Sequence, residues 1–293
     1  MNNVCGVIVS YKPAEQLLDN LRQLQKQVAA IVVVDNGSPE ETLAWLREAS
    51  RQIGFLFIEN PRNMGIAAAM NLGADWAIAA GYEWLAFFDQ DSQVAEGCMA
   101  SMLAASRREL QPSRPIAIYC PRYLDAESGS ERPLFSRDEF GEPLVSMSSG
   151  SLIRSTVYAE LGPFAEELFL YCVDDEYCLR AREQGYRLLR VPEAVLWHRE
   201  GASSSRRLFG RSLYVTNQPP ARRYYIMRNQ WWMYCRYPRT FPRRGSRLGN
   251  LAFIFRNALR ALLLEERRTA KCCAMLHGTT DFLCGRMGGR MPL

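Results

Sequence analysis

The 293-residue sequence lacks any uninterrupted apolar run that approaches the roughly 20 residues needed to span a bilayer, which excludes an integral membrane protein of the helical type. It has only two histidines, and its nine cysteines do not follow zinc-binding spacing. No signal peptide precedes Val4. We therefore expect a cytosolic protein whose cysteines are reduced thiols.

Acidic residues are scarce in the last third of the chain. Residues 199–293 hold 19 Lys and Arg but only four acids, whereas residues 1–198 hold 17 basic and 27 acidic residues. Two parts of opposite charge suggest two functions. The basic part is suited to an anionic surface, such as a membrane, a nucleic acid or a phosphorylated acceptor.

What the sequence does contain is an alternation of short apolar runs and helical patterns. Apolar runs bounded by turn residues predict strands at 4–10, 31–34, 55–59 and 84–89. Leucines at helical spacing predict a helix over 14–26, Ser38 is suited to cap a helix that begins at Pro39, and a third helix is predicted over 65–80. Strands that alternate with helices imply a parallel, right-handed βαβ sheet.

The pattern is less regular from 112 to 150, where Pro, Gly and Ser are frequent. Further elements are predicted as strands at 116–120, 144–149 and 187–191 and as helices at 154–161 and 174–184. The last of these helices begins with three acids, which the helix dipole favours.

The stretch from Trp84 to Ser92 ends a buried strand in two carboxylates, Asp89 and Asp91. Such carboxylates lie at the carboxyl edge of an open α/β sheet, where ligands bind. Hard oxygen ligands suit Mg²⁺ or Mn²⁺. An Asp-rich turn would explain the two residues equally well if they stood alone.

Polar residues also follow the other strands. Asp35, beside an Asn-Gly turn, can accept a hydrogen bond from a ring N–H of a base, and Tyr11, next to Ser10, can pack against the ring. Asn63 and Gly65 open a helix, where free backbone N–H groups bind anions. Each alone is an ordinary turn or helix-start residue, but together they favour a nucleotide site.

Several motifs lie in a fixed order along residues 4–237: Val9-Ser10-Tyr11-Lys12, Asp35-Asn36-Gly37-Ser38, Asn63-Met64-Gly65, Asp89-Gln90-Asp91, Asp174-Asp175-Glu176-Tyr177-Cys178-Leu179-Arg180, His198-x-x-Gly201 and Arg222-Arg223-Tyr224-Tyr225-x-x-Arg228-Asn229. This ordered set resembles the family 2 glycosyltransferases with the GT-A fold. The last string resembles the bacterial rhamnosyltransferase branch, which builds surface polysaccharides.

The resemblance implies an α/β protein with a Rossmann-like, mostly parallel sheet flanked by helices, followed by a C-terminal basic helical region. We expect a GT-A catalytic domain over 1–200, with a nucleotide-sugar half over about 1–110 and an acceptor half over about 111–200. The basic, mostly helical region then covers 201–293.

The resemblance also implies roles for single residues. The nucleotide-sugar would contact Ser10, Tyr11, Asp35, Asn63, Gly65, Asp89 and Gln90. Asp91 and His198 would hold Mg²⁺ or Mn²⁺, Asp174 would be the general base on the acceptor hydroxyl, and Glu176 would orient the acceptor. A helix cap is the alternative for Asp174, and a packing or surface residue is the alternative for His198.

The basic region interleaves aromatic residues with arginine between Arg222 and Tyr237. The anionic cleft beside it argues against a nucleic acid partner. One helical stripe is predicted further on, formed by Leu251, Ile254, Phe255, Ala258, Leu259 and Leu262. It would pack on the catalytic domain, join a homodimer or contact an anionic membrane. Trp231 and Trp232 favour the membrane, since the acceptor of such enzymes is typically lipid-diphosphate-linked.

We therefore expect an inverting, metal-dependent enzyme, peripheral at the inner face of the cytoplasmic membrane. It would transfer L-rhamnose from dTDP-L-rhamnose in O-antigen (lipopolysaccharide) or other surface polysaccharide synthesis. Another sugar from a UDP donor is the nearest alternative. A nucleotidyltransferase should carry a Gly-rich, basic phosphate loop, which Ser10 to Pro13 does not provide. A non-catalytic nucleotide-sugar-binding protein would need neither Asp174 nor His198.

Overall fold

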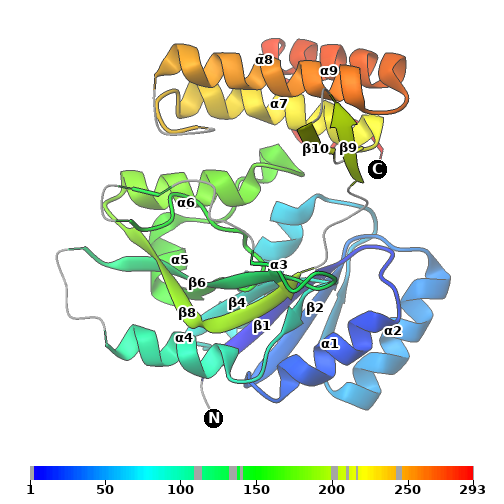
Figure 1. The fold of residues 1–293 in the computed structure, drawn as a ribbon. Coiled ribbons are helices and arrows are strands. Elements are labelled where there is room, and N and C mark those ends of the chain that lie inside the picture. Colours follow the sequence, from blue (N-terminus) through cyan, green and yellow to red (C-terminus); the bar gives the residue numbers. More distant parts are fainter. Residues whose placement is uncertain are drawn as a thin grey trace. The chain divides into compact units, whose positions relative to one another are not determined.

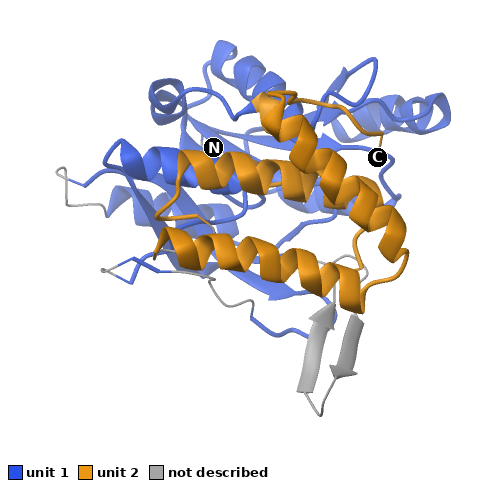
Figure 2. Cartoon of the chain, turned by 90° about the horizontal axis from the view of Figure 1, so that it is seen from above, with its two compact units in different colours: residues 1–165, 174–199 blue, residues 166–173, 200–293 orange. Residues whose placement is uncertain are grey.

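The structure is a computed structural model that describes residues 3–108, 114–131, 137–138, 141–198, 204–208, 211–215, 217–241 and 246–292. The chain forms two compact units (Figure 2). Unit 1 consists of residues 1–165 and 174–199, and unit 2 consists of residues 166–173 and 200–293. We predicted a single domain boundary near residue 200. That boundary would place the short segment 166–173 in the first part of the chain, whereas it belongs to unit 2.

The first half of unit 1 is a parallel sheet made of β1 (Val4–Ser10), β2 (Ala30–Asp35), β3 (Leu56–Glu59) and β4 (Trp84–Asp89), in the order β3-β2-β1-β4 (Figure 1). Their bounds agree with the predicted strands to within one residue. Most residues of β1, β2 and β4 are buried on both faces of the sheet, which is why these strands read as continuous apolar runs.

Helices cover both faces of this sheet (Figure 1). Leucines of α1 (Gln16–Gln25), with α2 (Glu40–Ile53) and α4 (Cys98–Arg107), pack on one face. The other face carries α3 (Ile66–Ala79), which lies so close that a Cβ on Gly73 would come within 2.5 Å of a Val7 methyl. The predicted fold class, a mixed α/β layer structure, is confirmed.

The second half of unit 1 adds β5 (Gln93–Val94), β6 (Ile116–Asp125), β7 (Leu152–Arg154) and β8 (Arg187–His198). Among the described residues the sheet has eight strands, in the order β3-β2-β1-β4-β7-β6-β8-β5. β7 is antiparallel to both β4 and β6, and β5 is antiparallel to β8, while β6 and β8 are parallel. The sheet is therefore parallel only in part.

Two local predictions were wrong. Residues 144–149 do not form a strand. They belong to a loop that continues to Gly150, whose N–H donates to Phe87 O of β4 at 2.7 Å. Ser38 does not cap a helix. Its hydroxyl donates to Asp35 at 2.7 Å and accepts from the Lys12 N–H, also at 2.7 Å. Helix α2 begins at Glu40 without a side-chain cap.

The remaining helices of unit 1 are α5 (Ser155–Leu161) and α6 (Val173–Glu183). Between them in the sequence lies a 3₁₀ turn, η1 (Glu166–Leu168), which belongs to unit 2. An aromatic cluster joins them to the sheet, since the Phe164 ring lies 5.2 Å from Phe87 and 4.3 Å from Tyr177 between centroids. Asn71 of α3 fixes this cluster, because its Oδ1 accepts from the Tyr158 hydroxyl at 2.8 Å.

Unit 2 contains α7 (Pro220–Arg236), α8 (Arg247–Leu264) and α9 (Arg268–Leu283), with a hairpin of β9 (Ser204–Leu208) and β10 (Arg211–Val215). A buried ionic cluster joins the three helices. Glu265 accepts from Lys271 of α9 at 2.9 Å and from Arg223 of α7 at 3.1 Å. Lys271 also donates to Asn217 at 2.8 Å, so the buried charges are paired and hydrogen-bonded.

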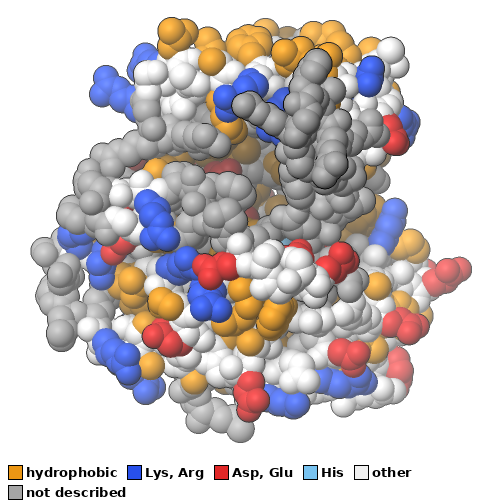
Figure 3. Space-filling view, in the orientation of Figure 1, with side chains coloured by type: hydrophobic (Ala, Val, Ile, Leu, Met, Phe, Trp, Pro, Cys, Tyr) orange, Lys and Arg blue, Asp and Glu red, His pale blue; other side chains and the backbone are white. Residues whose placement is uncertain are grey.

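Helix α8 is apolar on two faces, which corrects the single predicted stripe. Ile254 is fully buried, whereas Phe255 and Leu259 are more than half exposed (58% and 55%), as are Leu248 and Leu263. In Figure 3 hydrophobic side chains gather along the top of the view, over the helices of unit 2. Within the part of the chain that the structure describes, no helix has the length and apolarity to cross a membrane.

Candidate active site

The register of the sheet brings the predicted residues to one edge. Ser10 stands opposite Asp35 on β2, and Val9 stands opposite Asp89 on β4. Because β1, β2 and β4 are parallel, their carboxyl ends and the residues that follow them meet there.

Asp35 uses both of its carboxylate oxygens inside the protein. Oδ1 accepts from the N–H groups of Gly37 at 3.1 Å and Ser38 at 2.7 Å, and Oδ2 accepts from the hydroxyls of Ser10 at 2.9 Å and Ser38 at 2.7 Å. The residue is fully buried. Asp35 thus shapes the turn after β2, and its contact with a base stays a prediction.

Asn63 and Gly65 are held by Asn36, a residue that the predicted site did not include. The Asn36 amide donates to Asn63 Oδ1 and to the Gly65 carbonyl, both at 3.1 Å, while its oxygen accepts from the Met64 N–H at 2.9 Å. Asn63 Oδ1 also accepts from the Gly65 N–H at 3.0 Å. Hydrogen bonds therefore join the loops after β2 and β3 at the N-terminus of α3.

Gln90 ties the ends of β1 and β4 together. Its side-chain oxygen accepts from the Tyr11 N–H at 2.8 Å, and its carbonyl accepts from Asn20 of α1 at 3.2 Å. Tyr11 and Gln90 are thereby placed at the same edge as Asp89, as the sequence predicted, although a role in donor binding stays a prediction.

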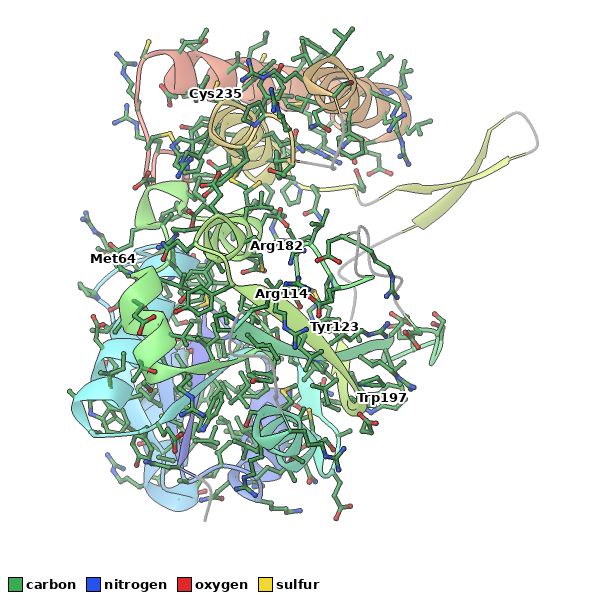
Figure 4. All side chains as sticks on the ribbon, turned by 90° about the vertical axis from the view of Figure 1, so that its left-hand side faces the viewer. Met64, Arg114, Tyr123, Arg182, Trp197 and Cys235 are labelled. Carbon is green, nitrogen blue, oxygen red and sulfur yellow. The ribbon has the colours of Figure 1, made fainter. Side chains whose placement is uncertain are left out.

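Asp91 and His198 meet because of a strand pairing. β5 starts two residues after Asp91 and pairs with the end of β8, with Gln93 opposite Trp197. Trp197 is labelled in Figure 4. His198, the last residue of β8, is thus carried to the same place as the two carboxylates. One possible ligand atom from each of Asp89, Asp91 and His198 lies within 4.8 Å of the other two.

These three side chains fit a divalent cation. Two carboxylates and one imidazole are a donor set that Mn²⁺ accepts, and Mg²⁺ tolerates if waters complete its shell. Burial, together with the charges of Asp174 and Asp91, raises the pKa of Asp89 to about 7. A bound cation would offset this repulsion, so the electrostatics of the site favour one.

A serine-rich loop, residues 146–151, supports the site and was not predicted. Ser149 Oγ accepts from the Asp89 N–H at 3.1 Å and lies 2.6 Å from Ser92 Oγ, which lies 3.4 Å from His198 Nδ1. The hydroxyl of Tyr123 on β6 (labelled in Figure 4) donates to the Met147 carbonyl at 3.2 Å and fixes the loop from the other side.

Gly150 makes this loop possible. Its φ of 80° is left-handed, and a Cβ there would lie 2.8 Å from Pro121 and 2.9 Å from Leu196. The Ser-Ser-Gly-Ser run at 148–151 was the available signal: several hydroxyls around a glycine predict a tight polar turn better than a strand.

Asp174 lies in the first turn of α6, where Ser148 donates hydrogen bonds to its carboxylate. Burial raises the pKa of Asp174, and the Ser148 bonds oppose that shift. The next residue, Ser149, accepts from the Asp89 N–H at 3.1 Å, so one loop contacts both Asp174 and Asp89. The charge of Asp174 also raises the pKa of Asp89. The structure thus brings the predicted base to the predicted metal ligands.

Glu176 has a different environment. Both of its oxygens accept from Arg180, at 3.0 and 2.9 Å, and Arg180 in turn donates to the carbonyls of Leu161 and Pro163 at 2.7 Å each. Glu176 is 4% exposed. Here it locks α6 to the loop after α5, and its predicted role with the acceptor stays a prediction.

A small pocket lies beside Asp174 and is lined in part by Ser148, Ser151 and Tyr177. The hydroxyls of Ser151 and Tyr177 are buried and have no hydrogen-bond partner among the described residues. Such polar groups can hold a water molecule behind the carboxylate.

Comparison with known proteins finds a family domain in the first half of the chain. Residues 6–128 match the family described as "Glycosyl transferase family 2". The chain is also 29% identical over 244 residues, 78% of each chain, to a protein of Shigella flexneri named dTDP-rhamnosyl transferase RfbF. The chain carries a family 2 glycosyltransferase domain. It is a glycosyltransferase, as the sequence motifs predicted.

Solved structures agree on the fold of this glycosyltransferase. A crystal structure of Staphylococcus aureus TarS with UDP-GlcNAc superposes with a TM-score of 0.57 at 14% identity, covering 97% of this chain and 81% of that one. The mannosyltransferase PcManGT of Pyrobaculum calidifontis, solved with GDP-Man and Mn²⁺, gives 0.55 at 15% identity, covering 99% and 76%. These likenesses confirm the predicted GT-A fold.

Proposed function

We propose that the protein is an inverting, metal-dependent rhamnosyltransferase that uses dTDP-L-rhamnose to extend a glycan in O-antigen or other surface polysaccharide synthesis. The observation that carries the proposal is the convergence of Asp89, Asp91 and His198 beside Asp174. A cation site next to a separate, buried carboxylate is what transfer from a nucleoside diphosphate requires, since one part stabilises the leaving group and the other activates the acceptor.

The donor is proposed from the relative named as a dTDP-rhamnosyl transferase. The test is consumption of each member of a panel of dTDP-, UDP- and GDP-sugars by the purified protein. We expect dTDP-L-rhamnose to be consumed fastest. Preference for a UDP-sugar would replace the sugar assignment but keep the enzyme class. Consumption of none would favour a non-catalytic binding protein, and release of pyrophosphate would favour a nucleotidyltransferase.

A divalent cation, Mg²⁺ or Mn²⁺, would be held by Asp91 and His198 with Asp89 beside them, and would supply positive charge to the departing diphosphate. Calorimetry with dTDP tests this assignment. We expect affinity for dTDP to fall at least about tenfold in EDTA, and the Asp91→Asn variant to show the same low affinity with or without the metal. Equal wild-type affinity in both buffers would contradict the metal site.

In the proposed reaction the acceptor oxygen attacks the anomeric carbon as the bond from that carbon to the diphosphate breaks. The acceptor proton passes to the carboxylate of Asp174, and the nucleoside diphosphate leaves with the bonding pair. A single displacement inverts the anomeric centre. Burial suits Asp174 to this role because a raised pKa makes its carboxylate a stronger base.

The acceptor is proposed to be a lipid-diphosphate-linked glycan at the inner face of the cytoplasmic membrane. Support comes from the basic composition of residues 199–293 and from the exposed apolar residues of α8, Leu248, Phe255, Leu259 and Leu263. Exposed arginines such as Arg256 and Arg260 lie on the same helix, which carries no acid. A homodimer through this face is the competing proposal.

A further inference from the structure

Arg228 and Asn229 belong to a sequence motif that the proposed reaction leaves without a role. Both are completely buried on α7. Arg228 is a cation that cannot be neutralised, so the protein has to surround it with acceptors or aromatic rings. Their partners in unit 2 show what the motif does.

Arg228 is directed at backbone carbonyls rather than at a carboxylate. Its guanidinium donates to Glu167 O at 3.2 Å, Leu168 O at 2.9 Å and Gly288 O at 2.5 Å. Nε donates to the Asn229 side-chain oxygen at 2.9 Å, which fixes the orientation of that amide. The rings of Tyr224 and Tyr225 lie 5.5 and 5.0 Å away and complete its surroundings.

Asn229 also binds backbone carbonyls. Its amide nitrogen lies 2.8 Å from Leu168 O, 2.7 Å from Leu170 O and 2.9 Å from Tyr171 O. Because an amide has two protons, three acceptors share them. Two neighbouring side chains of one helix therefore bind four carbonyls of the segment 166–173.

This segment needs such support. Phe169, Tyr171 and Cys172 all have left-handed backbone conformations, with φ of 63°, 66° and 61°. That conformation is unfavourable for residues with a Cβ, and three within four residues persist only where the surroundings impose it. Asn229 binds the converging carbonyls of Leu168, Leu170 and Tyr171. Arg228 and Asn229, which we call the clamp, therefore bind the segment where its backbone conformation is unusual.

Further contacts hold the same segment from the C-terminal tail. The Gly288 N–H donates to Glu167 O at 2.8 Å, and the Phe169 ring stacks on Tyr225 with centroids 5.0 Å apart. A Cβ on Gly289 would lie 2.6 Å from the Phe169 ring, so the tail passes directly over it.

We propose that Arg228 and Asn229 are positioning residues that hold the segment 166–173 and thereby fix the start of α6. The chain passes from this segment into α6 with no intervening loop, and the second residue of that helix is Asp174. The inference rests on the proposed function in that it gives Asp174 the role of base. A carboxylate misplaced by about 1 Å can lose up to about 10²-fold in rate, so the clamp would matter for turnover.

The first test is hydrogen exchange on the whole wild-type enzyme. We expect the amides of Phe169 and Leu170, which donate to Glu166 O at 3.0 Å and Leu168 O at 2.6 Å, to be protected to the same extent as those of α7, because the segment and the helix should open together. Fast exchange of this segment beside a protected α7 would overturn the proposal. This measurement needs no variant and does not depend on which residue is the base.

The second test compares variants on the same helix. Asn229→Asp replaces the donor by an acceptor facing three carbonyls, whereas Arg228→Lys keeps the charge and can still reach part of the carbonyls. Trp231→Phe is the matched control on the same helix, since it removes the 3.1 Å bond from the ring Nε1 to Thr279 of α9 and none of the bonds of Arg228 or Asn229. The probe is hydrolysis of dTDP-L-rhamnose, in which water replaces the acceptor and still has to lose a proton.

We expect kcat to fall about 10- to 100-fold in Asn229→Asp and less in Arg228→Lys, with affinity for dTDP and Mn²⁺ within about twofold of wild type. Trp231→Phe should lose thermal stability but keep kcat. Equal kcat in all folded variants, or a parallel loss in the control, would overturn the positioning role. If Asp174→Asn retains activity while the clamp variants lose it, the base assignment fails and the clamp stands.

Discussion

Asp174 and Asp175 are neighbours at the start of α6, and the structure gives them different surroundings. Asp174 accepts hydrogen bonds from Ser148. For Asp175, burial and the charge of Asp174 raise the pKa to about 7, and no hydrogen bond from the described residues opposes that shift. Hydrogen bonds thus orient the carboxylate of Asp174, whereas that of Asp175 is only buried. The two residues therefore lead to separate predictions.

Asp174→Asn keeps the shape of the side chain and removes its basicity. We expect kcat to fall at least about 10²-fold, as is typical for loss of a general base, with little change in affinity for the nucleotide. Steady-state turnover of dTDP-L-rhamnose and calorimetry with dTDP measure the two quantities. A variant with near wild-type turnover would show that Asp174 acts only as a first-turn residue of α6.

Asp175→Asn should have a milder effect on turnover, because this residue is displaced by about 100° around the helix. It should also stabilise the protein at high pH. The raised pKa means that the folded state holds a proton that the unfolded state releases between about pH 4 and 7, so the wild type loses stability as pH rises through that window.

Thermal melts at two pH values check this linkage. At pH 8 we expect Asp175→Asn to have the higher Tm, by a few degrees for a gain on the order of 1 kcal/mol. At pH 4 the two melting temperatures should approach each other. A lower Tm for the variant at pH 8 would mean that other groups stabilise the ionised carboxylate of Asp175.

At the scale of single elements, α8 is unusual because both of its faces are apolar. Ile254 is buried in the unit with Met227 and Met275, whereas Leu259 is 55% exposed. The two residues have similar side chains and opposite environments, which makes them a matched pair for substitution.

Ile254→Asp should destabilise unit 2 by about 3 kcal/mol or more, since it buries an unpaired charge. Leu259→Asp should change the Tm by no more than about 2 °C, yet weaken binding to anionic vesicles at least about fivefold. Melting curves and vesicle sedimentation on the same samples separate the two effects. Equal vesicle binding by wild type and Leu259→Asp would remove this face from the membrane proposal.

Elements with a strong apolar period were predictable, and those shaped by distant partners were not. β1 and β4 are found with their predicted bounds because continuous apolar runs reflect burial on both faces. β8 runs to His198 rather than ending at 191, since a register shift opposite Cys120 and Arg122 accommodates Pro192 within the strand. The serine loop escaped prediction because its hydroxyls bond to β4 and α6, far away in sequence.

At the scale of the whole molecule, the uneven distribution of charge along the chain predicts how the protein binds membranes. Residues 199–293 carry a large excess of arginine, and each basic residue close to anionic lipid contributes about 1 kcal/mol, screened by salt over a Debye length. We expect binding to anionic vesicles at about 50 mM salt that weakens at least tenfold at about 500 mM. Neutral vesicles are the control.

A different result would change the assignment of this surface. Failure to bind anionic vesicles at low salt, with a stable dimer in solution, would assign the exposed face of α8 to a subunit interface. Sedimentation velocity at several protein concentrations supplies that measurement. A monomer that binds no vesicle would contradict both proposals.

The charge asymmetry separated the two halves of the sequence but could not reveal that residues 166–173 cluster with the C-terminal part. The local sequence of that segment does not predict its hydrogen bonds with α7, because the acceptors are backbone carbonyls, which every residue has. The places of Asp89, Asp91 and Asp174 in the fold were predictable, since two of them follow a buried strand and the third lies in the first turn of a helix. The residues that hold them were not, since their bonds are non-local.

The bond from Gly288 to Glu167 has a consequence for the way the chain is made. A ribosome adds roughly 5–20 residues per second, so about 10 s separate the synthesis of these two residues. The sheet of β1 to β4 can form during that interval, whereas the stretch before Asp174 has to wait for α7 and then for the tail. A nascent chain, or one truncated before Gly288, would therefore hold a folded sheet while the carboxylate that we propose as the base is not yet positioned. We expect sugar transfer only after the chain has been made as far as Gly288.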